Sequence, residues 1–288
     1  YNNLGLTFRD LGRPEEAMAS YQQAVSLKPD YAIAHYNLAN VLRELERFED
    51  ALARYENAIS LQPNYPEAYQ YLGLTLHDLG RSEEAIASCQ QAVSLKPDYA
   101  IAHCSLGNIF RDLNNLERAT KSYQTAVKLM PDYVDAYNGL GLTLQDLGRL
   151  EEAIASYQQA VSLKPDYATG HYNLGNVFRD LNSLERATES YRTAINLTPD
   201  FAEGHYNLGN TLQDLGRFED AVASYRAALR VRPNYVDVYN NLGTTFQELG
   251  QLDEALECYQ KSISLRPNDA EMHWNLALVF LLRGDWEK

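Results

Sequence analysis

Proline recurs at a constant spacing along the whole chain, and this spacing constrains the fold more than any other feature. Eight of the ten prolines lie 34 residues apart, and only Pro14 and Pro66 fall outside the series. The series consists of Pro29, Pro63, Pro97, Pro131, Pro165, Pro199, Pro233 and Pro267. A fixed period of this length predicts stacked repeats, in which each repeat buries its apolar face only against its neighbours.

The apolar residues fall into register when each repeat is numbered so that this proline is position 32. Position 7 is then Leu, position 8 is Gly or Ala, position 20 is Ala, and position 24 is Tyr except at Cys89. At 100° per residue, positions 4, 7, 8 and 11 share one helical face, and positions 20, 24 and 27 share another. The sequence therefore predicts two amphipathic helices in every repeat, helix A followed by helix B.

Residues that end helices separate these two segments. Position 15 is Gly or Asn in every repeat except the one that carries Glu46, and both residues tolerate the left-handed conformation that ends a helix. Proline at position 32 cannot continue helix B. Asp or Asn at position 33 is expected to cap the next helix A.

This pattern resembles the tetratricopeptide-repeat family over the whole chain, although His is frequent at position 4, where the family has an aromatic residue. The resemblance implies an all-α fold, an α-solenoid whose helix-turn-helix repeats form a right-handed superhelix with a concave groove. We expect a single solenoid over residues 1–288, with partial repeats at 1–31 and 270–288. The complete repeats are expected at 32–65, 66–99, 100–133, 134–167, 168–201, 202–235 and 236–269.

Composition argues against several classes of function. The net charge of −14 argues against binding of nucleic acid through a basic face, and no apolar run is long enough to span a membrane. Cys89, Cys104 and Cys258 are spaced too widely for a zinc site or a disulfide framework, which favours a cytoplasmic location. We expect no catalytic centre, no metal and no cofactor.

Asparagine recurs on the face of helix A opposite the core stripe, which is the face that lines the groove in the family. At position 6 these residues are Asn3, Asn37, Asn173, Asn207, Asn241 and Asn275, and at position 9 they are Asn40, Asn108, Asn176 and Asn210. Asn is a mediocre helix former, so its recurrence needs a reason. Its carboxamide can donate and accept, which suits the backbone of an extended peptide. Alternatively, these side chains hydrogen-bond to neighbouring helices of the stack.

Charged residues lie on the same face. Position 13 is acidic in each of the first eight repeats, and Arg is frequent at position 12. The candidate groove residues of this kind are Arg43, Arg111, Arg179, Asp112, Asp146, Asp180 and Asp214. The acids either pair with Arg at position 16 or 12, or they select the ligand. Because acids exceed bases here, we expect a neutral or basic extended segment to bind.

We interpret the chain as a scaffold that binds a protein or peptide. The segments HYNLGNVF (171–178) and HYNLGNTL (205–212) resemble the repeat arm of O-GlcNAc transferase and its bacterial relatives. This resemblance implies an alternative function, the substrate-recruiting arm of a glycosyltransferase whose catalytic domain is not in this chain. The sequence begins inside one helix A and ends inside a helix B, so we expect a fragment whose uncapped ends could self-associate.

Overall fold

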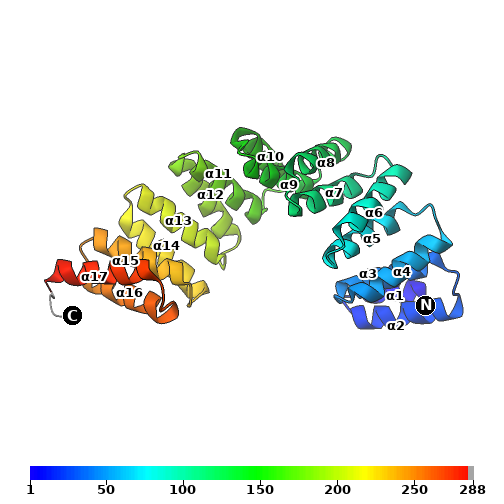
Figure 1. Cartoon of the computed structure of the whole chain (residues 1–288), viewed down its shortest axis with the longest axis horizontal. Coiled ribbons are helices and arrows are strands. Elements are labelled where there is room, and N and C mark those ends of the chain that lie inside the picture. Colours follow the sequence, from blue (N-terminus) through cyan, green and yellow to red (C-terminus); the bar gives the residue numbers. More distant parts are fainter. Residues whose placement is uncertain (285–288) are drawn as a thin grey trace. The chain divides into compact units, whose positions relative to one another are not determined.

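The computed structural model describes residues 1–284, and every regular element in this range is an α-helix (Figure 1). The all-helical repeat fold predicted from the sequence is thereby confirmed. The helices belong to two compact units, Tyr1–Gly148 and Arg149–Lys288. The division falls within the predicted repeat 134–167, between its A and B helices.

Helices A and B alternate along each unit. The first unit contains α1 (Asn2–Asp10), α2 (Pro14–Leu27), α3 (Ala32–Glu44), α4 (Phe48–Leu61), α5 (Pro66–Asp78), α6 (Ser82–Leu95), α7 (Ala100–Asp112), α8 (Leu116–Leu129) and α9 (Val134–Asp146). The second contains α10 (Leu150–Leu163), α11 (Ala168–Asp180), α12 (Leu184–Leu197), α13 (Ala202–Asp214), α14 (Phe218–Val231), α15 (Val236–Glu248), α16 (Leu252–Leu265) and α17 (Ala270–Arg283). Odd-numbered helices are A helices, and even-numbered helices are B helices.

The turn from helix A to helix B uses a left-handed residue at position 15. Asn114 and Asn182 have φ values of 56° and 55°, and Glu46, the exception in the sequence pattern, has φ 58°. The N–H of Arg47 donates to the carbonyl oxygen of Leu42 at 2.8 Å, which closes the end of α3. Because the backbone bonds are the same as in the other repeats, Glu46 adopts this conformation in spite of its side chain.

The predicted capping of helix A by position 33 is wrong. The N-cap residue is the next one, an aromatic residue such as Tyr31 or Tyr99, and it makes no side-chain cap bond. The residue at position 33 lies one place too early for its side chain to reach the first N–H groups of the helix. Asp269 is at position 34 instead, and its Oδ1 accepts from the N–H groups of Glu271 and Met272.

Repeats that have Tyr at position 24 and Gly at position 8 pack the tyrosine of helix B on the glycine of helix A. Tyr123 is fully buried, and a Cβ atom at Gly107 would lie 2.7 Å from its Cε1 atom. Tyr225 is also fully buried, and a Cβ atom at Gly209 would lie 2.5 Å from its ring. The small residue at position 8 is therefore required by the close approach of the ring at position 24.

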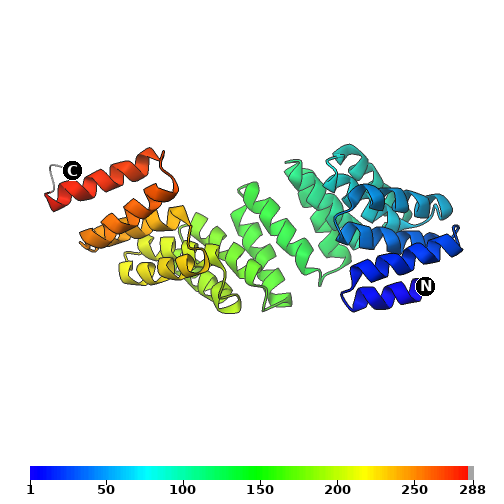
Figure 2. The ribbon, with the colours of Figure 1, turned by 90° about the horizontal axis from the view of Figure 1, so that it is seen from below.

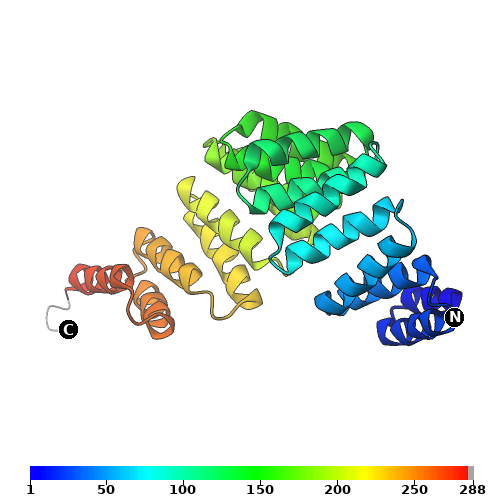
Figure 3. The ribbon, with the colours of Figure 1, turned by 45° about the vertical axis from the view of Figure 1, so that its right-hand side comes forward.

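Helices pack against each other both within a repeat and between neighbouring repeats. In the first unit, α1 lies beside α2 (Figure 2), α6 also packs on α7, and the A helices α3, α5 and α7 touch in succession. In the second unit, α15 lies beside α16 (Figure 3), and the A helices α13, α15 and α17 touch in the same way. Successive A helices therefore bring their outward positions together within each unit.

Candidate functional site

The candidate site is the surface formed by positions 2, 5, 6, 9, 12 and 13 of the A helices, called here the helix-A face. Its order in space is set by contacts between residues 35 apart, because position 5 of one repeat meets position 6 of the next. Asn37 Nδ2 donates to Asn2 Oδ1 at 3.0 Å, and Asn275 Nδ2 donates to Asn240 Oδ1 at 3.1 Å. The polar rows of the helix-A face thus continue from repeat to repeat within a unit.

Four asparagines at position 6 hydrogen-bond to the preceding repeat, namely Asn37, Asn207, Asn241 and Asn275. In the second unit, Asn207 Nδ2 donates to Tyr172 Oη at 2.9 Å and to Asn176 Oδ1 at 3.1 Å. Asn241 repeats this arrangement one repeat later, with Tyr206 and Asn210 as acceptors at 3.2 and 2.9 Å. The structure therefore shows the alternative explanation for these residues, hydrogen bonding within the stack. Asn37 and Asn173 are buried, whereas Asn3 is exposed.

The asparagines at position 9 accept a hydrogen bond from the buried tyrosine at position 24. The donor–acceptor distances are 2.6 Å for Tyr55–Asn40, 2.5 Å for Tyr123–Asn108, 2.7 Å for Tyr191–Asn176 and 2.7 Å for Tyr225–Asn210. The tyrosine hydroxyl fixes the carboxamide so that Oδ1 faces the core and the Nδ2 donors remain on the helix-A face. Sequence reasoning did not identify these pairs, although the constant spacing of 15 residues between tyrosine and asparagine is a signal that could have found them.

Charged residues at positions 12 and 13 form ion pairs between repeats in the first unit. Arg9 pairs with Glu44 at 2.6 Å, Arg43 pairs with Asp78 at 2.9 Å, and His77 Nε2 lies 2.9 Å from Asp112 Oδ2. The predicted pairing of Arg at position 12 with the acid at position 13 is seen for Arg9 and Arg43, and at the third step a histidine stands in the place of arginine. This pairing joins successive repeats because the two positions lie one repeat apart.

The predicted pairing of Arg at position 16 with the acid at position 13 is wrong. Arg81 and Arg149 instead bind Glu84 and Glu152, three residues later, each at 2.6 Å. The remaining pairs of this kind are Arg13–Glu16, Arg47–Asp50 and Arg217–Asp220. Residues three apart face each other on the first turn of helix B, so the arginine reaches this acid first. The hydrogen bond from the arginine lowers the pKa of both Glu84 and Glu152.

Some acids of the helix-A face have no ion-pair partner among residues 1–284. Asp146, Asp214 and Glu248 belong to this group, and Gln directly precedes each of them at position 12. Arg111 lies 3.9 Å from its chain neighbour Asp112, and within the described range no ion pair joins Arg179 to Asp214. At position 2, Glu67, Glu203 and Asp237 pair with the cation at position 31 of their own repeat. The uncompensated negative charge is therefore smaller than the sequence indicates, and in the second unit it includes Asp214 and Glu248.

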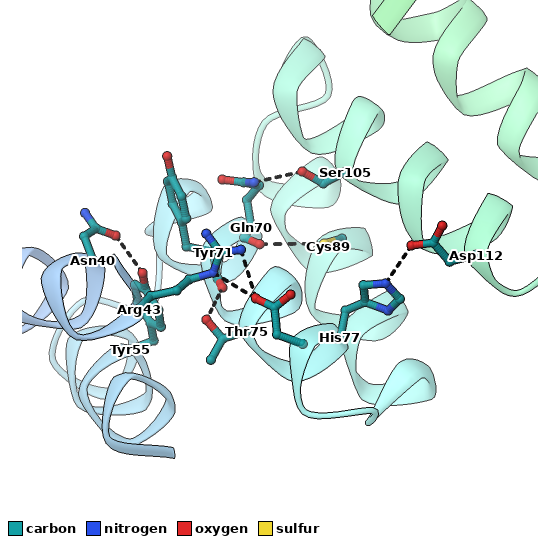
Figure 4. A network of polar contacts seen from close by, with 11 residues as sticks. Asn40, Arg43, Tyr55, Gln70, Tyr71, Thr75, His77, Cys89, Ser105 and Asp112 are labelled. Atoms are coloured by element: carbon teal, nitrogen blue, oxygen red, sulfur yellow. Dashed lines mark hydrogen bonds and ion pairs between the residues drawn. The ribbon is translucent and has the colours of Figure 1, made fainter. Parts of the chain in front are cut away.

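One repeat of the first unit departs from this pattern (Figure 4). Gln70 and Tyr71 occupy positions 5 and 6, and Gln70 Nε2 donates to Ser105 Oγ at 2.8 Å. Cys89 replaces the tyrosine at position 24, and its thiol lies 3.8 Å from the carbonyl oxygen of Gln70. Burial raises the pKa of Cys89 to about 12, so the group is a neutral thiol at neutral pH.

The histidines at position 4 have a structural role. His35 Nε2 lies 2.9 Å from the carbonyl oxygen of Pro29, and His205 Nε2 lies 2.9 Å from that of Pro199. This bond ties helix A to the proline turn that precedes it. In the range 1–284, no three His, Cys, Asp or Glu side chains lie close enough to hold a metal ion. None of the helices in that range combines the length and the apolar character needed to cross a membrane.

Comparison with known proteins finds the same repeat. A model described as "TPR repeat" matches residues 5–45, 107–148, 144–178 and 175–216, and two described as "Tetratricopeptide repeat" match 36–100 and 200–268. Among curated proteins, no sequence is similar enough to be counted as a relative.

Several solved structures are similar to the chain. The crystal structure of MamA is 25% identical, with a TM-score of 0.55, over 58% of this chain and 97% of MamA. The crystal structure of YrrB, described as a TPR protein with an unusual peptide-binding site, is 24% identical, with a TM-score of 0.57, over 64% of this chain and 94% of YrrB. The APC/C hetero-tetramer Cut9–Hcn1 is 16% identical, with a TM-score of 0.63, over 92% of this chain and 52% of the matched chain. These likenesses agree with the observed fold.

Proposed function

Because the chain belongs to the tetratricopeptide-repeat family, we propose that it is a scaffold whose helix-A face binds an extended segment of another protein. The observation that carries this proposal is the row of amide donors at position 9. In the second unit, the carboxamides of Asn176 and Asn210 are held by tyrosine hydroxyls through Oδ1. Their Nδ2 groups are therefore oriented in advance to donate to the carbonyl groups of a peptide backbone.

The charge of the helix-A face supports a neutral or basic ligand. Asp214 lies one helical turn after Asn210 on α13. Asp214 and Glu248 have no ion-pair partner among the residues that the structure describes, whereas Glu44 and Asp78 are neutralised by arginine. Uncompensated carboxylates raise the local concentration of cations and disfavour acidic segments. We therefore place the selection for basic residues in the second unit.

A peptide titration tests the charge preference. We expect a Lys-rich peptide to bind more tightly than a Glu-rich peptide of the same length, with a difference that decreases as salt is added. The double variant Asp214→Asn with Glu248→Gln should weaken binding of the Lys-rich peptide about tenfold, because two exposed charge contacts are lost. Fluorescence anisotropy measures both effects.

The matched control is Glu185→Gln with Glu189→Gln on α12. It changes the net charge by the same amount, but neither residue belongs to the helix-A face. Equal weakening in both double variants would assign the preference to the net charge of the chain instead of this face. Equal or tighter binding of the Glu-rich peptide would overturn the proposed ligand.

A second candidate function is the recruitment of substrates to a glycosyltransferase, as the likeness of segments 171–178 and 205–212 implies. The recurrent bonds from Asn207 to Asn176 and from Asn241 to Asn210 favour it, because they build a continuous row of carboxamides. Sequencing the parent gene beyond the codon for residue 288 tests this function directly. A parent protein without a transferase domain would leave the general scaffold as the only candidate.

A single right-handed superhelix over the whole chain and self-association through its ends also remain proposals. Trp274 and Leu282 on α17 are 70% and 55% exposed, and Leu11 near the first helix is 62% exposed. Apolar side chains exposed at the ends of a stack of repeats favour association between copies.

A further inference from the structure

Tyr71 enlarges a tyrosine cluster on the helix-A face of the first unit. The corresponding cluster of the second unit, Tyr206 with Tyr225 and Tyr235, has Asn241 at that place. The tyrosine patch of the first unit consists of Tyr36, Tyr55, Tyr65 and Tyr71. The ring centroid of Tyr36 lies 5.0 Å from that of Tyr65 and 6.0 Å from that of Tyr71. Tyr71 is stacked on Tyr55, with 6.3 Å between centroids and 12° between planes. Tyr55 is fully buried, whereas Tyr36 and Tyr71 are half-buried and present part of their rings.

The corresponding residues of the second unit show what Tyr71 changes. There, position 6 is Asn207 or Asn241, and its amide donates to the hydroxyl of the preceding tyrosine at position 5. In the first unit, Tyr71 takes the place of that amide beside Tyr36, so an aromatic contact replaces a hydrogen bond. Figure 4 shows the Tyr71 ring directed away from the polar contacts around Thr75 and His77. The patch thus presents ring surface where the second unit presents carboxamides.

The charges near the patch are paired. Arg9 binds Glu44 and Arg43 binds Asp78, on the A helices that carry or flank the tyrosines. Arg9 also interacts electrostatically with Tyr71, so a positive charge already lies near this ring. Because Glu44 and Asp78 already hold these guanidinium groups, a charged side chain of a ligand, cationic or anionic, would have to compete with an existing ion pair. The patch therefore favours an uncharged group with a flat apolar surface.

We infer that the tyrosine patch binds a proline-containing stretch of the partner segment in the polyproline II conformation. Proline rings pack flat on aromatic side chains, and a polyproline II segment is already extended before it binds, so little conformational entropy is lost. This inference rests on the proposed function, because it requires that the helix-A face binds extended segments. It adds to that function the statement that the first unit selects proline in the bound segment.

The test uses the full chain and two uncharged fluorescent peptides of equal length, one built of Pro-Pro-Ala repeats and one in which Ser replaces proline. The proline peptide should bind about tenfold more tightly, as expected for contacts with two tyrosine rings. Tyr71→Asn introduces the residue that other repeats have at position 6, as Asn207 and Asn241, so we expect the repeat to fold with it. This variant should remove most of the tenfold preference. Tyr36→Asn introduces the residue that other repeats have at position 5, as Asn2, Asn138 and Asn240, and it should have the same effect.

The double variant Glu185→Gln with Glu189→Gln, on α12 and outside the helix-A face, is the matched control and should leave the preference for proline unchanged. Circular dichroism melts verify that each variant is folded. If the Lys-rich peptide binds but proline gives no gain, or if both tyrosine variants keep the gain, the inference about the patch is wrong and the proposed function stands. If neither the Lys-rich nor the proline peptide binds, the proposed function fails as well.

Discussion

Replacing Tyr225 with alanine is expected to lower the free energy of unfolding by about 3–5 kcal/mol, the usual cost of removing a buried aromatic ring. The ring is fully buried, and it fills the space above Gly209, where no Cβ atom could be accommodated without movement. Its hydroxyl also donates to Asn210 Oδ1 at 2.7 Å. The substitution therefore leaves a cavity between α13 and α14 and frees the carboxamide that it orients. Denaturation by urea, followed by circular dichroism, measures the change.

Tyr225→Phe separates the two contributions. It keeps the ring and removes only the hydroxyl, which lies within hydrogen-bond distance of Asn210 Oδ1 and Gln213 Oε1, so the expected loss of stability is about 1 kcal/mol. The phenylalanine variant should also leave the carboxamide of Asn210 held by Asn241 alone, which loosens it and weakens peptide binding. An alanine variant as stable as the phenylalanine variant would show that the ring does not support the packing of this repeat.

High pH is expected to unfold the chain, because buried tyrosines and cysteines must ionise. Burial raises the pKa of Cys89 and Cys258 to about 12 from an ordinary value of 9.0, and it raises the pKa of Tyr123 and Tyr191 above its usual value of 10.0. These groups hold their protons more tightly in the folded state. Their contribution to stability is complete below the unfolded pKa values and is lost as the pH rises toward the folded ones.

The free energy of unfolding should therefore change little from these groups up to about pH 9 and then fall as the pH approaches 12. The slope is about 1.4 kcal/mol per pH unit for each group that ionises only in the unfolded state. The part of the tyrosinate absorbance that comes from the buried rings should change together with circular dichroism, since these rings ionise only when their repeat opens. Ionisation of all tyrosines without loss of helical signal would contradict the burial described here.

The sequence by itself determined the repeat and its core. Periodic proline, leucine, alanine and tyrosine define which residues face inward, because an amphipathic helix of period 3.6 has only one way to bury such a stripe. The small residue at position 8 belongs to the same pattern, and the structure shows the close approach that it allows between Gly107 and Tyr123. Contacts inside one repeat join residues about 15 apart in a fixed register, so the sequence pattern alone indicates which residues meet.

Only the tertiary structure decided the partners of polar side chains on the helix-A face. Asn207 is bound by Tyr172 and Asn176, residues of the preceding repeat, and Arg43 is bound by Asp78 of the following one. Whether two such groups meet depends on the angle and offset between stacked repeats, which no single repeat encodes. The cap of helix A was predicted wrongly because a shift of one residue moves an aspartate out of reach of the helix end. Within each repeat, burial of a periodic stripe is a property of the sequence, whereas polar contacts between repeats are set by the geometry of stacking.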